Sequence, residues 1–346
     1  MAYEVTIGIP VYNVEKYIRQ TMDSALAQTF QSIEFLICDD CGSDSSIAIV
    51  QEYQQTHPRG KDIRIVRQPH NKGIGEARNR MMDEAQGRFF FSLDADDMII
   101  PNAIELLYNA AKEHHADLVY GSYERLFDSG KRETVAPCPY PFRVFTQPDE
   151  YAMYAYNVGV QVMNWNYLLS TEVIRKNHLR VTPVGHGYGE DFTYTVDLPT
   201  YVTRVVLLPD ITYQYYIEEK VFSGKRQKVM SRDQMDKSIE AIDKKKRRCE
   251  LKDKPYYAKR CATLLMYDFS FACQILSRRK EVEPPYSNKE IQDVMWQPMS
   301  LWQIIHSRQS RSRNLVAWLI SNVPAFCAVW LLSAMKSMSS RNNTPD

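Results

Sequence analysis

The chain has 346 residues, of which 44% are hydrophobic and 25% are charged, with 13 Gly and 17 Pro. This composition is typical of a globular protein of one or two domains and excludes a mostly disordered or fibrous chain. The net charge of +1 argues against a general nucleic-acid binder. The charge is unevenly divided, because residues 1–220 hold 20 Lys and Arg against 30 Asp and Glu, whereas residues 221–346 hold 23 against 12. The basic part is typical of a surface that faces phosphates, such as an anionic membrane.

The seven cysteines show no framework spacing, and residues 1–10 lack the basic and long apolar segments of a secretory signal peptide. Both features predict a reduced, cytoplasmic setting. Cys38 and Cys41 form a C-x-x-C pattern, but a turn follows them and no second cysteine pair completes a zinc site. We therefore expect neither a redox nor a metal role for these thiols.

The first 125 residues alternate between short apolar runs and segments of helical periodicity. In chain order the expected elements are a strand at 5–9, a helix at 15–28, a strand at 33–38, a helix at 45–55, a strand at 63–66, a helix at 75–86, a strand at 88–93, a helix at 102–114 and a strand at 117–123. This alternation implies right-handed crossovers. It predicts an α/β fold with a mostly parallel, Rossmann-like sheet and helices on both of its faces.

Eight residues, most of them polar, follow three of the expected strands, at the sheet edge where α/β proteins bind their ligands. They are Pro10, Tyr12 and Asn13 after the first strand, Asp39 and Asp40 after the second, and Asp94, Asp96 and Asp97 after the fourth. Five carboxylates at one edge repel each other unless a cation joins them, and hard oxygen ligands of this kind suit Mg²⁺ or Mn²⁺. Capping of the following helices accounts for one or two of these aspartates, but not for the set. The pattern predicts a metal–diphosphate site.

Six sequence motifs resemble, in the same order, those of the inverting family 2 glycosyltransferases with the A-type nucleotide-sugar (GT-A) fold. The matching segments are residues 9–13 (IPVYN), 34–44 (EFLICDDCGSD), 71–79 (NKGIGEARN), 87–97 (GRFFFSLDADD), 189–191 (GED) and 213–216 (YQYY). The resemblance covers about residues 3–220. It implies a catalytic domain at 1–220, with a nucleotide-sugar half at about 1–115 and an acceptor half at 116–220.

The resemblance also implies roles for the residues that bind the donor. Pro10 and Tyr12 would flank the nucleotide base, and Asp39 would accept the imide N–H of that base. A carboxylate satisfies the N3–H of uracil, so UDP is the favoured nucleotide, with other imide-bearing bases such as thymine left open. In the DxD motif, Asp96 would bind the Mn²⁺ or Mg²⁺ that bridges the two phosphates, and Asp94 would reach the ribose or the water shell of the metal.

By the same resemblance, inverting transfer needs one general base to take the proton of the acceptor hydroxyl, and Asp191 is the candidate. Glu190 would orient or contact the acceptor. Arg78 would help to hold the diphosphate, although a helix-surface arginine explains it equally well. The Gln-x-x-Arg-Trp motif of processive family members is missing, because none of the five tryptophans follows an arginine. We therefore expect one sugar to be added per visit.

Residues 221–346 are expected to form a basic, smaller helical region, with a run of Lys and Arg at 244–248. Residues 314–335 carry no charge, and a segment of this length just suffices to cross a bilayer. Asn322 and Pro324 near its middle oppose a spanning helix. A helix that lies at the membrane interface fits equally well, and a buried core helix is the third alternative. We expect association with the inner face of the cytoplasmic membrane.

These observations predict a metal-dependent, non-processive, inverting glycosyltransferase. It would move one sugar from a nucleotide sugar to a hydroxyl of a glycan acceptor, in the synthesis of a bacterial-type surface polysaccharide. Attachment to the membrane favours a lipid-linked acceptor, such as a sugar on a polyprenyl diphosphate. One alternative uses a polyprenyl phosphate itself as the acceptor. The other is a catalytically silent nucleotide-sugar-binding scaffold, against which the presence of Asp94, Asp96 and Asp191 argues.

Overall fold

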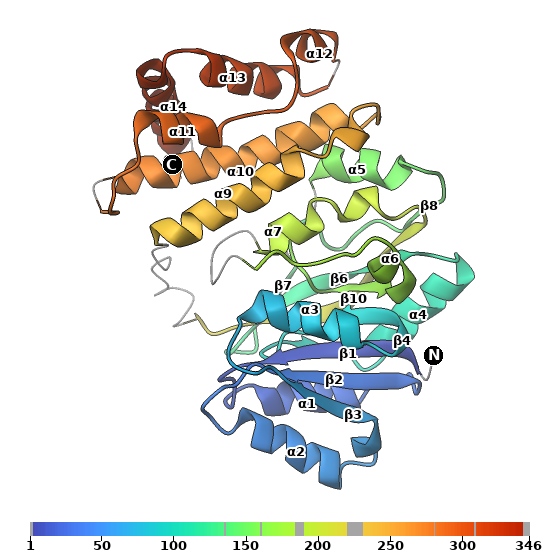
Figure 1. Cartoon of the computed structure of the whole chain (residues 1–346). Coiled ribbons are helices and arrows are strands. Elements are labelled where there is room, and N and C mark those ends of the chain that lie inside the picture. The colour runs from blue at the N-terminus through green and yellow to red at the C-terminus, as the bar shows by residue number, and fades with distance from the viewer. Residues whose placement is uncertain are drawn as a thin grey trace. The chain divides into compact units, whose positions relative to one another are not determined.

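The computed structural model describes residues 3–134, 136–159, 161–183, 190–219, 231–279, 281–307 and 309–341 (Figure 1). The described residues fall into two compact units. The first unit comprises Met1–Tyr151, Val162–His186 and Glu190–Lys228, and the second comprises Ala152–Gln161, Gly187–Gly189 and Val229–Asp346. A short piece from the middle of the sequence therefore packs with the C-terminal region.

The first unit is built on one sheet with the strand order β3-β2-β1-β4-β9-β6-β10-β5, to which β7 and β8 add at β6 and β10. Its strands are β1 (Tyr3–Val11), β2 (Ile33–Asp39), β3 (Ile63–Arg67), β4 (Gly87–Ser92), β5 (Met98–Ile99), β6 (Leu118–Phe127), β7 (Arg132–Thr134), β8 (Arg143–Phe145), β9 (Tyr167–Ser170) and β10 (Val205–Ile217). The first four strands in this order run parallel to their neighbours. The short β9 enters antiparallel between β4 and β6, and β6 and β10 are parallel again.

The helices of the first unit connect these strands as the sequence pattern predicts (Figure 1). They are α1 (Ile18–Leu26), α2 (Ser46–Thr56), α3 (Ile74–Glu84), α4 (Ala103–Glu113), α6 (Thr171–Lys176) and α7 (Glu190–Thr195), while α5 (Glu150–Val158) runs from the first unit into the second. Each of the nine elements expected in the first 125 residues is present, with ends displaced by a few residues. The predicted α/β fold is confirmed.

Helices cover both faces of the sheet. Successive side chains of β4 point to opposite faces, and each contacts a different helix. Phe90 faces α3: a Cβ added to Gly8 on the neighbouring β1 would lie 2.7 Å from Phe90 and 3.2 Å from Met81 of α3. Phe89 instead contacts Tyr108 of α4 edge-on, with the ring centroids 6.1 Å apart. Burial on both sides explains why β1, β2 and β4 are rich in apolar residues.

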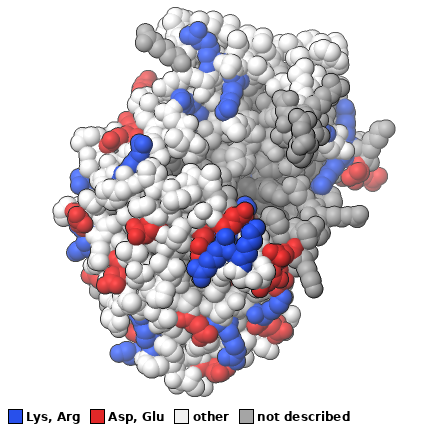
Figure 2. Space-filling model, turned by 180° about the vertical axis from the view of Figure 1, so that it is seen from behind, with Lys and Arg blue, Asp and Glu red and all other residues white. Residues whose placement is uncertain are grey.

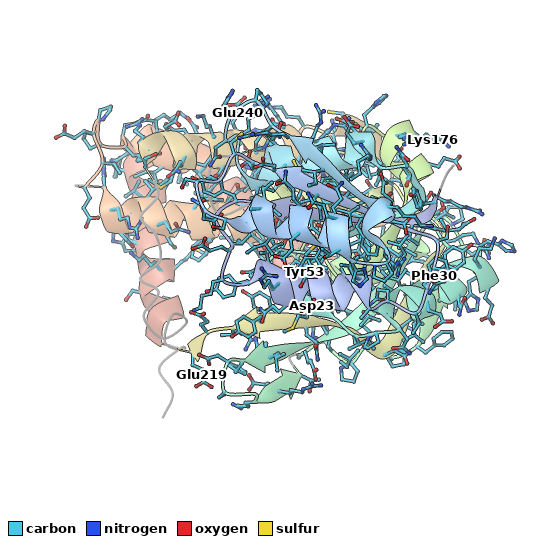
Figure 3. The ribbon with its side chains drawn as sticks, turned by 90° about the horizontal axis from the view of Figure 1, so that it is seen from below. Asp23, Phe30, Tyr53, Lys176, Glu219 and Glu240 are labelled. Carbon is cyan, nitrogen blue, oxygen red and sulfur yellow. The ribbon has the colours of Figure 1, made fainter. Side chains whose placement is uncertain are left out.

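Helices α1 and α2 pack against each other beside the sheet. The Tyr53 hydroxyl of α2 donates a hydrogen bond to Asp23 of α1 at 2.5 Å, and Figure 3 shows the two side chains side by side. On α1 the apolar residues Ile18, Met22 and Ala25 recur at helical spacing and are fully buried. The buried face of α1 is therefore formed by its apolar residues together with Thr21.

The segment just before β9 is fixed on β10 by stacking and hydrogen bonds. Trp165 stacks on the ring of Tyr213, with the centroids 4.4 Å apart and the planes 10° from parallel. The next residue, Asn166, has a φ of 66° and accepts a hydrogen bond from the Thr212 hydroxyl at 2.6 Å. Strand β6 approaches the same hydroxyl closely, since a Cβ on Gly121 would lie 1.9 Å from it. This packing leaves residue 164 little freedom to move.

The second unit is helical, as predicted for the C-terminal region (Figure 1). Its helices are α9 (Arg232–Lys246), α10 (Tyr257–Arg278), α11 (Asn288–Val294), α12 (Leu301–His306), α13 (Arg311–Asn322) and α14 (Ala325–Arg341). Three of them begin with capping boxes formed by Ser231, Ser287 and Ser300. One core cluster joins Leu251, Tyr257, Cys261, Met299 and Ile304.

The uncharged segment 314–335 is divided between two helices. Helix α13 ends at Asn322, and α14 begins at Ala325, directly after Pro324. Proline cannot donate the backbone hydrogen bond that would continue α13 and is well tolerated at a helix start. Across the part of the chain that the structure describes, no helix is both long and apolar enough to span a bilayer.

Candidate active site

The DxD loop follows β4 at the carboxyl end of the strand, beside the end of β1. The Leu93 N–H donates to the Gly8 carbonyl at 3.0 Å, and the Asp97 N–H donates to the Asp94 carbonyl at the same distance. These bonds fold the loop into a tight turn. The side chain of Asp96 is exposed, and that of Asp94 is 20% exposed. The loop therefore leaves Asp96 open to solvent and Asp94 partly so.

The third acid of this loop, Asp97, has a structural position. It is fully buried and accepts hydrogen bonds from the Tyr213 hydroxyl at 2.7 Å and from the Tyr216 N–H at 2.8 Å. Burial, followed by the nearby charges of Asp96 and Asp94, raises the pKa of Asp97 well above its usual range. Asp97 thus ties the loop to β10.

Asp40, which directly follows β2, is also bonded to the backbone. The Asp40 carboxyl accepts the N–H groups of Lys72 at 2.8 Å and Gly73 at 2.9 Å, and so anchors the loop that leads into α3. Asp40 and Asp97 are thus bonded to protein groups, which gives two of the five carboxylates at this edge a structural role and leaves the metal assignment with Asp94 and Asp96. Among the described residues, no three His, Cys, Asp or Glu side chains gather closely enough to hold a metal ion by themselves.

The residues assigned to the base lie at the ends of the neighbouring strands β1 and β2. Pro10 is buried within β1, and Tyr12 just beyond it is 44% exposed. Asp39 is buried at the end of β2, where its carboxyl accepts the Cys41 N–H at 2.9 Å. Its second oxygen lies 3.3 Å from Nε of the largely exposed Arg67. Val11 pairs with Asp39, so the exposed ring of Tyr12 follows the end of β1 next to the end of β2.

Arg78 of α3 lies at the centre of the site. It is only 4% exposed, so the alternative of a helix-surface arginine is wrong. Its Nη2 donates to Asp94 Oδ1 and its Nη1 to Asp191 Oδ1, both at 2.8 Å. Burial alone would lower the pKa of Arg78, but the charges of Asp94 and Asp191 outweigh it and raise the pKa. A permanently charged guanidinium thus joins the DxD loop to the proposed base.

Asp191 stands in the first turn of α7 with its side chain 40% exposed. Its Oδ1 accepts a second hydrogen bond, from Nδ2 of Asn164 at 2.7 Å. Within the described part of the chain, Oδ2 has no such partner and remains available to a ligand. Burial raises the pKa of Asp191, the charge of Arg78 acts against this, and the charge of Asp94 adds to it. The result is a raised pKa, which is typical of a carboxylate that takes up protons.

Sequence reasoning brought together Asp94, Arg78 and Asp191 but missed Asn164. The signal that could have found it is the polar–aromatic–polar pattern of residues 164–166, which precedes a short buried strand. Glu190, next to the proposed base, is buried, and its Oε2 lies 3.1 Å from where a Cβ on Gly75 would be. The glycine of the GED motif, Gly189, lies outside the described residues.

The sequence and the fold are similar to those of known proteins. Residues 6–165 match the family model of glycosyl transferase family 2. The chain is 34% identical over 157 residues to a chondroitin synthase from Escherichia coli. The matched segment covers 41% of this chain and 22% of that protein. It is also 34% identical over 122 residues to the E. coli UDP-Glc:alpha-D-GlcNAc-diphosphoundecaprenol beta-1,3-glucosyltransferase WfgD, covering 35% of this chain and 46% of that protein. The chain thus spans less than half the length of both relatives.

Among solved structures, residues 1–349 of S. aureus TarS superpose with a TM-score of 0.62 over 92% of this chain and 90% of that one, at 16% sequence identity. At this identity the likeness concerns the fold. The strand order of the sheet, the family match and the similar solved structure together define a GT-A fold. The matching part of the chain, residues 6–165, is similar to glycosyltransferase family 2.

The Arg78 bridge yields a prediction about stability. In Arg78→Ala, Asp94 and Asp191 lose their shared partner, and we expect the free energy of unfolding to fall by about 3 kcal/mol, the lower end for breaking a buried pair because Asp191 is partly exposed. Arg78→Lys should recover only part of the loss, since one ammonium group cannot pair with two carboxylates in the planar geometry of guanidinium. Urea unfolding measures both. Wild-type stability of Arg78→Ala would contradict the bridge.

Proposed function

We propose that the protein is a non-processive, inverting glycosyltransferase that moves one sugar from a nucleotide sugar, favoured as a UDP-sugar, to a hydroxyl of a glycan acceptor. The observation that carries this proposal is the bridge from Asp94 through Arg78 to Asp191. In this bridge Asp94, which we assign to the donor side, and Asp191, whose pKa is raised, bond the same guanidinium. A catalytically silent scaffold has no need for such an arrangement.

The transfer follows from the positions of these groups. The acceptor hydroxyl approaches Asp191, whose Oδ2 takes the proton as the acceptor oxygen forms a bond to the anomeric carbon. The bond from that carbon to the diphosphate breaks, its electron pair leaves with the nucleoside diphosphate, and the anomeric configuration inverts. Arg78 and Asn164 hold Oδ1 of the base, so the free oxygen keeps one orientation toward the acceptor.

The donor set suits a hard divalent cation. Asp96 offers an exposed carboxylate, and Asp94 keeps one oxygen that does not bond to Arg78. Mg²⁺ and Mn²⁺ are commonly held by one or two carboxylates together with substrate phosphates, so two aspartates without a closed protein cage fit this chemistry. When bound, such an ion neutralises the charge that builds on the departing diphosphate.

Relatives support the choice of donor and acceptor. One solved structure of TarS, 18% identical to this chain and with a TM-score of 0.62, is a complex with UDP-GlcNAc. The printed name of WfgD describes a UDP-sugar donor and a diphosphoundecaprenol-linked acceptor. We therefore propose a UDP-sugar donor and a lipid-linked glycan acceptor in surface polysaccharide synthesis. Product analysis distinguishes this acceptor from a polyprenyl phosphate.

The base assignment predicts the behaviour of Asp191→Asn. An amide cannot accept the acceptor proton, so the rate of transfer should fall by roughly 10²- to 10⁴-fold while UDP still binds. In the wild type, kcat/KM should rise with pH through the raised pKa of Asp191, because the base acts in its ionised form. Asp210→Asn makes the same change at an exposed position of β10 and serves as the control. Full transfer activity of Asp191→Asn would refute the assignment.

The donor and metal assignments predict a shift in thermal unfolding. UDP at a hundred times its Kd should stabilise the protein by ~2.7 kcal/mol, more with Mn²⁺ or Mg²⁺ than with EDTA. Asp96→Asn should abolish the difference between metal and EDTA and leave the fold intact. A panel of nucleotides in a thermal-shift assay measures this. Unchanged metal dependence in Asp96→Asn would remove Asp96 from the metal site, and stabilisation by a different nucleotide would overturn the role of Asp39.

We also propose that the second unit attaches to the cytoplasmic face of a membrane. Phe326 and Trp330 lie four residues apart on α14 and are 68% and 69% exposed, and Trp302 on α12 is 69% exposed. Figure 2 shows one face of the molecule, on which Lys and Arg side chains lie among uncharged areas and Asp and Glu side chains. The unit also has an apolar groove of about 350 Å³ whose lining includes Arg313. Exposed aromatic residues beside basic ones are typical of helices that lie at an anionic membrane surface.

This attachment predicts selective binding to vesicles. The full chain should co-sediment with vesicles rich in anionic phospholipid, more weakly as salt rises, and less with zwitterionic vesicles. Phe326→Ser combined with Trp330→Ser should reduce binding by removing the apolar contact. Phe142→Ser, which changes an exposed phenylalanine of the first unit, should not. Equal binding by all variants would contradict the assignment of this surface.

A further inference from the structure

Three buried polar atoms beneath the proposed base have no hydrogen-bond partner among the described residues. They are Nε of Arg78, Oγ of Ser92 and Oδ1 of Asn164. The three residues are 4%, 4% and 3% exposed, so bulk water does not compensate these atoms. An unsatisfied polar atom in such a position is destabilising, and a native site rarely leaves three of them together.

The same three residues line one small cavity. Its volume, taken as the space open to the centre of a water molecule, is about 10 Å³. The rest of its wall is formed by Met82, Phe90, Tyr167, Val181 and Tyr194. A space of roughly 10–15 Å³ holds one water, and a buried water typically makes about three hydrogen bonds. The cavity therefore matches a single water molecule in both size and number of polar neighbours.

We propose that one internal water occupies this cavity and joins Arg78, Ser92 and Asn164. The donors and acceptors balance: Nε of Arg78 donates to the water, the water donates to Oδ1 of Asn164, and the Ser92 hydroxyl completes the set as donor or acceptor. Every remaining polar atom of Arg78 and Asn164 already has a role, since their other nitrogens bind Asp94 and Asp191.

This water makes Ser92 a positioning residue for the proposed reaction, a role that rests on the proposed function. Arg78 and Asn164 are the two groups that hold Oδ1 of Asp191. Ser92 ends β4, and its strand is fixed by pairing of Ser92 with Gly8 on β1. The water thus links the central sheet, through Ser92, to Arg78 and Asn164, which orient the base.

A crystal structure of the full chain at a resolution that shows ordered waters tests the site without any activity. We expect one water within hydrogen-bond distance of all three atoms, and its loss or displacement in Ser92→Ala. A dry cavity in the wild type, or a guanidinium that bonds Ser92 directly, would overturn the proposal. This outcome does not depend on whether the protein transfers sugar.

Kinetics test the positioning role. Ser92→Ala should lower kcat by about three- to tenfold with an unchanged KM for the donor, which is the effect of one weakened hydrogen bond in orienting the base. Ser92→Thr keeps the hydroxyl and should retain kcat within about twofold. A wild-type kcat in Ser92→Ala, with the water gone, would refute the positioning role. A fall in both kcat and thermal stability that Thr does not rescue would assign Ser92 to packing alone.

Discussion

The first unit depends on the burial of one guanidinium. Arg78 lies almost entirely inside the protein and remains charged, which is tolerable only where carboxylates pair with it. The loop after β4 supplies Asp94, and the start of α7 supplies Asp191. Segments far apart in the sequence must therefore reach one point. The parallel strands β1 and β4 provide it, because their carboxyl ends lie at the same edge of the sheet.

The aspartates at this edge have different tasks, which their partners decide. Asp97 and Asp40 are buried and bonded to backbone or tyrosine groups, so they hold the loops in place. Asp96 is exposed and Asp191 is partly exposed, so both can meet a ligand. The buried acids fix the orientation of the exposed ones. Without the hydrogen bonds from β10 to Asp97, the DxD loop would not keep its aspartates in one orientation.

The periodic part of this architecture could be predicted from the sequence, and the non-periodic part could not. Strands β1 to β4 are apolar runs with strong local signals, and the DxD loop follows directly from them. Strand β9 has four residues and enters between β4 and β6 through pairings with distant segments, which no local pattern encodes. Arg78 reads as a surface residue of a helix until its two distant partners are known. Asn164 is likewise fixed by the stacking of its neighbour Trp165.

The charge of the site bears on the proposed cation. The guanidinium of Arg78 donates its hydrogen bonds to the carboxylates of Asp94 and Asp191, and the exposed Asp96 adds a further carboxylate to the loop of Asp94. Arg78 therefore has little positive potential left for a diphosphate, and among the residues that the structure describes these groups by themselves would repel a doubly charged anion. The first 220 residues add to this repulsion, with 20 basic against 30 acidic residues. Under the proposed function, a nucleoside diphosphate needs positive charge to bind at this edge, and the divalent cation proposed for Asp96 would supply it.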